Sequence, residues 1–212
     1  MHFVPNTKSF KLLGLHLDET LTWKFHINHL RKKLSYSNYI MNKVKNVLPK
    51  ESLLILYHSL FHCHLNYGVE IWGACSNIST ISILQKRAIR VINRARYNNH
   101  TEPLFRKNNI LKVTDLHTLR ALIFMHKLKS DKLPNSFKNM NFFIPHIRPT
   151  REIYLHMAQT KRSRTKYSAS LPLHNFPKIW NNSRDWNPLC HSNAKCPTIL
   201  LVPTVYPSSM TM

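Results

Sequence analysis

The hydrophobic pattern of the chain changes its period near residue 20. Residues 10–17 (FKLLGLHL) alternate, with leucines on one face and Phe10 and Leu12 on the other. This alternation predicts a short strand that is buried on both sides. The DETLT segment that follows predicts a turn, in which Thr20 or Thr22 is the N-cap of a helix.

From Trp23 onward the apolar positions recur at spacings of three, four and seven, which predicts an amphipathic helix of about six turns that ends before Pro49. The buried stripe is expected to contain Ile27, Leu30, Leu34, Ser37, Met41, Val44 and Leu48. The opposite face carries Lys24, Arg31, Lys32, Lys33, Lys43 and Lys45.

Three further helices follow in the pattern. Residues 51–67 are apolar nearly all round, which is typical of a central helix, and Gly68 fits a C-cap before a turn. A third helix is expected over 79–96, with a buried stripe of Ile81, Leu84, Ala88, Val91 and Ala95 and with Ile92 beside it. A loop (YNNHTEPLF) precedes a fourth helix over 114–129, capped by Thr114, with Leu116, Leu119, Ile123 and Leu128 on one side.

The predicted fold is mainly α-helical: a small helical bundle with a short N-terminal β-strand and an irregular C-terminal region. Residues 1–22 form the strand and turn, and 23–133 form the bundle. Residues 134–185 mix proline, serine and basic residues, so an irregular basic region is expected there. Residues 186–212 hold no acid and several prolines, and are expected to be a disordered tail.

Charge narrows the range of functions. The 212 residues contain 31 Lys and Arg against 9 Asp and Glu, a formal net charge of +22. Such an excess favours a polyanionic partner, of which nucleic acid is the commonest and an anionic membrane surface the second. No apolar run reaches spanning length and no secretory signal is seen, so we expect a nuclear or cytoplasmic protein with reduced cysteines rather than a secreted one.

The candidate nucleic-acid contacts are basic residues without interleaved acids. A solvated helix face normally carries Glu for i, i+4 pairs, and the third helix carries none. The candidates are Lys24, Arg31, Lys32 and Lys33 on the first helix, Lys86, Arg87, Arg90, Arg94 and Arg96 on the third, and Arg162 and Arg164 in the C-terminal region. Trp23, Tyr67 and Trp72 are expected to pack rather than to stack on bases.

No metal site and no cofactor are expected. His58 and His62 share a helix face, but neither Cys63 nor His64 supplies a third ligand on that face. Cys190, His191 and Cys196 lack a fourth ligand for a zinc knuckle. The adjacent acids Asp18 and Glu19 are expected to stabilise a helix N-terminus.

Four separated motifs carry a family resemblance. They are FKLLGLHLDETLTWKFHINHL, LYHSLFHCHLNYGVEIWG, LQKRAIRVINRARYNNHTEPLF and ILKVTDLHTL, in this order. They resemble the region downstream of the polymerase active site in reverse transcriptases of jockey-like non-LTR retrotransposons, over roughly residues 8–185. RTKYSASLPLHNFPKIWN is similar to the segment near the end of such proteins.

The resemblance implies a division of roles. Residues 11–17 match a primer-grip strand at the edge of the palm, with Leu13 and Gly14 as the primer-grip-like residues. Residues 23–97 match the helical thumb that holds the primer–template duplex. RNA or an RNA–DNA hybrid is therefore the implied partner. The family's paired catalytic aspartates are missing, because no two of Asp18, Asp115 and Asp131 are adjacent, and the family's endonuclease region is missing too, so neither polymerase nor endonuclease activity is expected.

Two other interpretations stay open at this point. In the first, the chain is a basic helical module that binds a protein partner or self-associates through surface left exposed by a missing palm. In the second, it is a translated remnant of a mobile element without function. Peripheral binding to an anionic membrane is a weaker third hypothesis.

Overall fold

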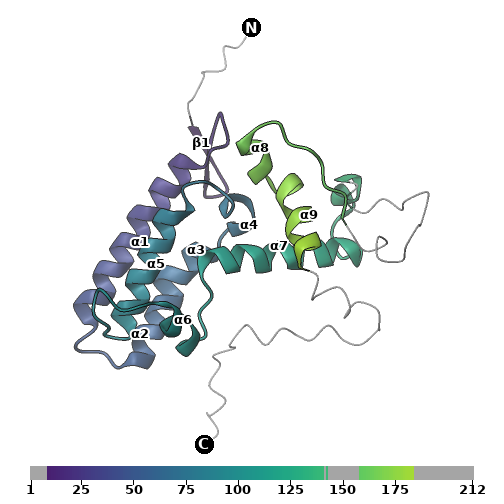
Figure 1. The fold of residues 1–212 in the computed structure, drawn as a ribbon. Helices are drawn as coiled ribbons and strands as arrows, with labels where there is room; N and C mark the ends of the chain where they lie inside the picture. Colours follow the sequence, from purple (N-terminus) through teal and green to yellow (C-terminus); the bar gives the residue numbers. More distant parts are fainter. Residues whose placement is uncertain (1–8, 141, 143–157, 184–212) are drawn as a thin grey trace, which may run out of the picture.

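Helices dominate the chain, as predicted, and they form a bundle with a small antiparallel sheet at the N-terminal side (Figure 1). The computed structural model describes residues 9–140, 142 and 158–183, so the prediction for 186–212 lies outside the described residues. The elements are β1 (Ser9–Leu12), β2 (Leu15–Asp18), α1 (Lys24–Val44), α2 (Lys50–Leu56), the π-helical segment η1 (Tyr57–His62), α3 (Cys63–Asn66), α4 (Val69–Trp72), α5 (Ile78–Ile92), α6 (Glu102–Lys107), α7 (Val113–Lys129), the 3-10 helix η2 (Asn135–Met140), α8 (Lys166–Ser170) and α9 (Pro172–Asn182).

The N-terminal stretch is a hairpin rather than the single strand expected over residues 10–17. β1 and β2 pair antiparallel, and Leu12 faces Leu15 across a two-residue turn. The turn residues Leu13 and Gly14 have φ angles of 46° and 84°, which fit the primed turns that match strand twist. The strand finds its partner within the same stretch, and it is not buried on both faces, since Phe10 and Leu12 of β1 are 54% and 53% exposed.

Asp18 joins this hairpin to the first helix. Its carboxylate accepts hydrogen bonds from the backbone N–H groups of Thr22 and Trp23, both at 3.0 Å, and from the hydroxyls of Thr20 and Thr22. Burial raises the pKa of Asp18, but these hydrogen bonds outweigh that effect and leave it below the ordinary value. The expected N-cap at Thr20 or Thr22 is therefore wrong: Trp23 precedes α1, and the acidic residue supplies the capping oxygens.

The buried stripe of α1 follows the sequence prediction closely. Ile27, Leu30, Leu34, Ser37 and Met41 are buried, and Ser37 is accommodated because its hydroxyl donates to the Leu60 carbonyl. Val44 and Leu48 pack against the same core at its margin.

The second predicted helix is interrupted by a π-helical turn. α2, η1 and α3 are consecutive, and their buried residues Leu53, Tyr57, Phe61 and Leu65 are each four positions apart. The wider turn of a π-helix keeps such a spacing near one face. The helix is not buried all round, because Ile55 is 61% exposed. Gly68 follows α3 with a φ of 64°, as a C-cap requires, but the expected turn after it contains α4.

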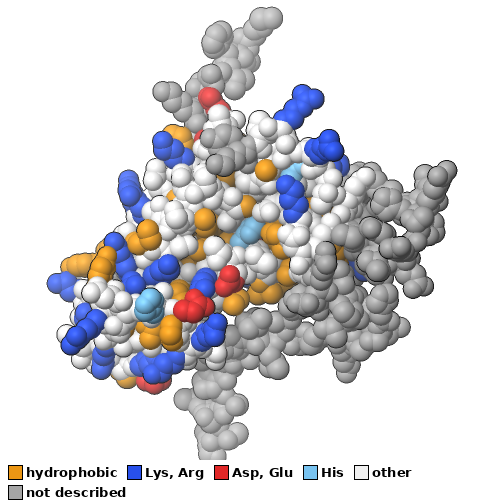
Figure 2. All heavy atoms as spheres, in the orientation of Figure 1, with side chains coloured by type: hydrophobic (Ala, Val, Ile, Leu, Met, Phe, Trp, Pro, Cys, Tyr) orange, Lys and Arg blue, Asp and Glu red, His pale blue; other side chains and the backbone are white. Residues whose placement is uncertain are grey.

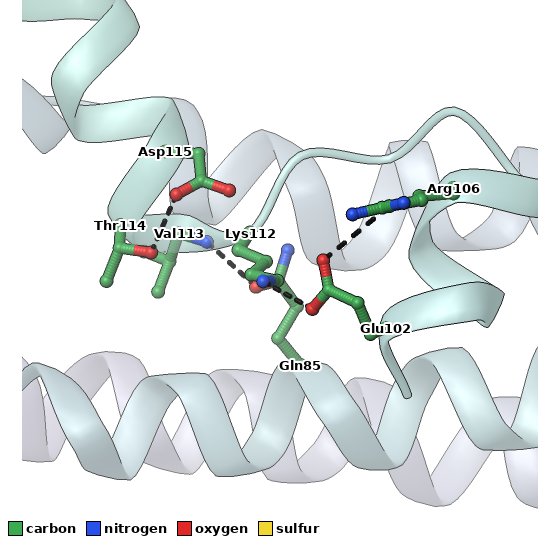
Figure 3. Close-up of polar contacts among 7 residues, drawn as sticks. All are labelled: Gln85, Glu102, Arg106, Lys112, Val113, Thr114 and Asp115. Carbon is green, nitrogen blue, oxygen red and sulfur yellow. Dashed lines mark hydrogen bonds and ion pairs between the residues drawn. The ribbon is translucent and has the colours of Figure 1, made fainter. Parts of the chain in front are cut away.

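The α5 helix buries a polar residue that the sequence pattern placed outside its core stripe. Gln85 is 1% exposed, and it donates to the Tyr57 hydroxyl at 3.0 Å and the Leu111 carbonyl at 2.8 Å. Its side-chain oxygen accepts from the Val113 N–H at 2.9 Å (Figure 3). The buried stripe is shifted accordingly: Gln85 and Ile89 are buried, while Val91 and Ala95 are only partly so.

An ion-pair cluster lies on the solvent side of this junction. Within the loop expected before the fourth helix, α6 forms, and its Glu102 meets Lys112 at 2.5 Å and Arg106 at 3.8 Å (Figure 3). Lys112, rather than the expected Thr114, is the N-cap of α7. These charges are exposed, so they contribute less to stability than the buried amide of Gln85.

A second, smaller core forms on the far part of α7. Ala121 and Met125 of α7 pack with Phe176 and Trp180 of α9, which crosses α7 in Figure 1. Helices α8 and α9 thus occur within residues 134–185, where only irregular structure was expected. Two prolines at the start and inside α9 obscured its apolar period, although Pro172 takes a first-turn position that tolerates proline.

Close packing joins α4 to α7. A Cβ atom added at Gly73 would lie 2.5 Å from the Val69 carbonyl oxygen and 2.6 Å from His117 Cδ2. Only glycine permits this approach, so α7 is held directly against the turn that follows α4.

Replacing Gln85 by Met is expected to lower the free energy of unfolding by about 3 kcal/mol, because buried donors and acceptors on three segments lose their partner. Urea unfolding followed by circular dichroism measures the change. Ser82→Ala on the same helix removes only a 3.3 Å bond to the Ile78 carbonyl, and it should change stability by less than about 0.5 kcal/mol. Equal stability of Gln85→Met and wild type would contradict this account of the junction.

Candidate nucleic-acid interface

Helices α1 and α5 run side by side in the same direction. Asn38 of α1 donates to the Leu84 carbonyl of α5, and further along both helices Arg94 donates to the carbonyls of Lys45 and Leu48. The C-terminal ends of the two helices therefore lie together, and basic side chains from both meet there.

An open hollow of about 430 Å³ lies between these helix ends. It is lined by Asn42, Lys45, Asn46, Arg87, Arg90, Val91, Arg94, Ala95 and Tyr97. Four of these residues are cations and none is an acid. We call this site the basic hollow.

Arg94 has a structural role in the basic hollow. It has a φ of 49° just beyond α5, and its guanidinium bonds the carbonyls of Lys45 and Leu48 at 3.1 and 3.0 Å. These carbonyls lie in the turn just after the C-terminal end of α1, where cations are favoured. Arg94 therefore fixes the geometry of the hollow, although its side chain is still exposed to solvent.

Arg90 is also positioned by its neighbours. Its Nε donates to the Asn99 carbonyl at 3.2 Å, and its guanidinium lies 5.7 Å from the centre of the Tyr97 ring. Both contacts use one edge or face of the guanidinium, which has five N–H donors. The remaining donors are available to an anion in the hollow.

Lys45 and Arg87 are the cations of the hollow whose side chains have the fewest contacts with other protein groups. Among the described residues neither has an acidic group within ion-pair distance, since the ion pairs there involve Glu70 and Glu102. Arg87 is exposed and Lys45 is half-buried. Lys45 was placed on the polar face by the sequence pattern but not singled out, because only the pairing of α1 with α5 brings it to Arg87.

The structure brings together only some of the predicted contact residues. Arg87, Arg90 and Arg94 share the hollow, whereas Lys86 lies near enough to Glu102 of α6 to lower the pKa of that acid, after the larger effects of Lys112 and Arg106. The face expected to be free of acids thus acquires one from another element. Arg96 is exposed outside the hollow.

The other predicted contacts form separate groups. Lys24, Arg31, Lys32 and Lys33 are exposed on the first half of α1, near the hairpin. Arg162 and Arg164 are exposed just before α8. Figure 2 shows Lys and Arg side chains along the edge formed by α1 and around the end where α2 and α6 lie, with few acidic groups on this face.

The aromatic residues behave largely as predicted. Trp23 and Trp72 are buried, at 4% and 0% exposed. Tyr67 is 54% exposed, but its hydroxyl donates to the Leu13 carbonyl and so ties α3 to the hairpin turn.

The histidines do not assemble into a metal site in the described part of the chain, where no three potential ligands are placed to hold a metal ion. His58 and His62 lie with ring centres 5.4 Å apart, without a third ligand. Cys190, His191 and Cys196 lie outside the described residues. No helix among those described has the length and apolarity needed to cross a membrane.

Comparison with known proteins shows relatives of one class. The chain is 31% identical over 94 residues to a probable RNA-directed DNA polymerase from transposon X-element of Drosophila melanogaster, which covers 42% of this chain and 10% of that protein. It is 29% identical over 130 residues to a probable RNA-directed DNA polymerase from transposon BS of the same species, covering 58% and 14%. The RNA-directed DNA polymerase from mobile element jockey of Drosophila funebris is 25% identical over 139 residues, covering 63% and 15%.

These matches relate the chain to transposon RNA-directed DNA polymerases. Within that class its curated homologues are jockey-like and other non-LTR elements, matched over about 40–60% of this chain, as the sequence motifs predicted. The matched stretch is only 10–15% of the length of those relatives. No family model matches the chain, and no solved structure matches it.

Acid is expected to destabilise the fold through two histidines, the buried His26 and the half-buried His62. Burial, reinforced by neighbouring positive groups, lowers the pKa of His26 and of His62 from 6.5 to about 4. Between these two pH values the unfolded chain binds more protons than the folded chain, so the free energy of unfolding falls as pH is lowered, by up to about 1.4 kcal/mol per pH unit for each imidazole.

Urea unfolding at pH 7, 6 and 5 measures this dependence. His62→Gln should reduce the slope of stability against pH, whatever it does to stability at pH 7. A slope that is the same with and without His62 would contradict the assignment.

Proposed function

We propose that this chain binds the phosphate backbone of RNA or of an RNA–DNA hybrid without sequence preference, and that the basic hollow is its main contact. The proposal rests on one observation. Lys45, at the end of α1, and Arg87 and Arg90, on the parallel helix α5, line the same hollow, and the lining contains no acid. Clustered cations in a folded protein are normally paired with acids, so a group of cations without acids suits an external anion.

The chemistry of the lining favours phosphate. Arginine presents a planar fork that matches phosphate oxygens, and lysine adds a mobile point charge. Asn42 and Asn46 supply neutral donors of the kind that contact phosphate and sugar oxygens. The hollow is open, which suits a backbone that passes through rather than a small molecule that is enclosed.

The relatives support nucleic acid as the polyanion. Their names describe RNA-directed DNA polymerases, which act on RNA and DNA. We further propose that residues 23–133 correspond to a thumb-like bundle and that Leu13 and Gly14, at the tip of the hairpin, are the primer-grip-like residues.

Catalysis is not expected from the residues of this chain. Two-metal nucleotidyl transfer needs clustered carboxylates. Asp18 is committed to the start of α1, and Asp115 accepts from the Thr114 hydroxyl at the start of α7. We therefore propose that the chain contributes binding and no polymerase chemistry of its own.

Filter binding of a labelled 20-nucleotide RNA between 50 and 400 mM salt tests the proposal. The wild-type affinity should fall linearly with salt on logarithmic axes. Lys45→Gln with Arg87→Gln should reduce the slope by about 1.4, and the affinity at 0.1 M salt by about 20-fold, because two phosphate contacts are lost. Arg94 is left in place because it supports the fold.

Lys127→Gln with Lys132→Gln is the matched control. It removes the same charge from exposed positions at and just beyond the far end of α7, and it should change the slope by less than half as much. Equal effects of the two double variants would indicate unspecific charge attraction and contradict the basic hollow. A flat salt dependence, or no binding at 50 mM salt, would contradict nucleic-acid binding altogether.

A further inference from the structure

A ridge of alternating basic and aromatic side chains runs along the outer face of α1. Its members are Lys32, Tyr36, Tyr39 and Lys43, at successive spacings of four, three and four, which place them on one side of the helix. That side is opposite the buried stripe that contains Leu34 and Met41. We call these four residues the tyrosine ridge.

Both tyrosines present their rings to solvent. Tyr36 is 67% exposed and Tyr39 is 58% exposed, and they are among the most exposed large apolar side chains of the described residues. A single exposed aromatic residue is ordinary, but here two stand one helical turn apart between two lysines. Neither ring is needed by the core, which α1 already fills from its other face.

The charge around the ridge is uniformly positive. The 21 residues of α1 include no acid, so the two lysines of the ridge have no i, i+4 partner on their own helix. Lys43 Nζ lies 5.5 Å from the centre of the Tyr39 ring. A cation held against the ring by this contact is also in place to meet a phosphate attached to a base stacked beside it.

The ridge continues into the basic hollow. Asn42 lines the hollow and lies three residues after Tyr39 on α1, so the two side chains are neighbours on the helix surface. A strand whose phosphates occupy the hollow can therefore extend along the ridge. The two tyrosines are about 4.5 Å apart along the helix axis, a little more than the 3.4 Å between nucleotides of one strand, so each ring can meet a different base.

We propose that Tyr36 and Tyr39 stack on bases of a single-stranded segment of nucleic acid, while Lys32 and Lys43 contact its phosphates. This inference rests on the proposed function and adds a preference to it: single strands, whose bases are accessible, bind more tightly than duplexes, whose bases are stacked inside. Stacking on an aromatic ring accepts every base, so the ridge adds strand preference without sequence preference.

The test uses the full chain and two fluorescent probes, a 15-nucleotide oligo(U) and an RNA–DNA hybrid duplex of the same length and mixed sequence. Tyr36→Ala with Tyr39→Ala should weaken oligo(U) binding tenfold or more and hybrid binding less than twofold. The salt slope should not change, because no phosphate contact is removed. Tyr36→Phe with Tyr39→Phe keeps the rings, and should bind oligo(U) within twofold of wild type.

Ile83→Ala provides a control for the loss of exposed apolar surface, since Ile83 is 51% exposed on α5, away from the ridge. It should leave both affinities unchanged. Thermal unfolding of every variant should match wild type, because both tyrosines are exposed.

Each outcome bears on a different claim. If the alanine double variant binds oligo(U) like wild type, or loses hybrid binding equally, the ridge is not a stacking surface and the inference is overturned while the basic hollow stands. If the phenylalanine variant is as weak as the alanine variant, the hydroxyls rather than the rings make the contact, and stacking is again overturned. If the wild-type chain binds neither probe, both the inference and the proposed function are overturned.

Discussion

The buried amide of Gln85 is the interaction on which the arrangement of the helices depends. It links the π-helical turn at Tyr57, the backbone of Leu111 and the first N–H of α7, all from a side chain that is almost fully inaccessible to water. These bonds fix the position of α5 against η1, and thereby its position beside α1. The basic hollow depends on this position, because the ends of α1 and α5 together form it.

The electrostatic design of the bundle follows from the direction of α1 and α5. Two parallel helices bring two negative dipole ends together, and cations are favoured there. Arg94 bonds the carbonyls of Lys45 and Leu48 just after α1 and accounts for part of the local charge. The side chains of Lys45 and Arg87 are not needed to stabilise the helix end, because the carbonyls there already accept hydrogen bonds from Arg94. This excess of positive charge is the reason to assign the hollow to an external anion rather than to helix stabilisation alone.

Local periodicity was enough to predict much of the fold, and tertiary contacts decided the rest. The stripe from Ile27 to Met41 and the C-cap at Gly68 were visible because each depends on neighbours along the chain. The hairpin turn was missed because Leu13 adopts a positive φ that leucine seldom takes. Gln85 was missed because a polar residue gives no signal of burial until its partners are known. The residues of the hollow were predicted only in part. Its arginines on and just after α5 were predicted, but Lys45 joins them only because α1 packs beside α5.

Lysine footprinting by acylation and mass spectrometry, with and without a bound single-stranded RNA, tests the central claim most directly. If nucleic acid lies in the basic hollow and along the tyrosine ridge, Lys43 and Lys45 become protected while Lys127 and Lys132 react as before. Lys127 on α7 and Lys132 just after it provide an internal reference within the same molecule. Equal protection of both pairs, or protection of Lys127 and Lys132 alone, would contradict the account.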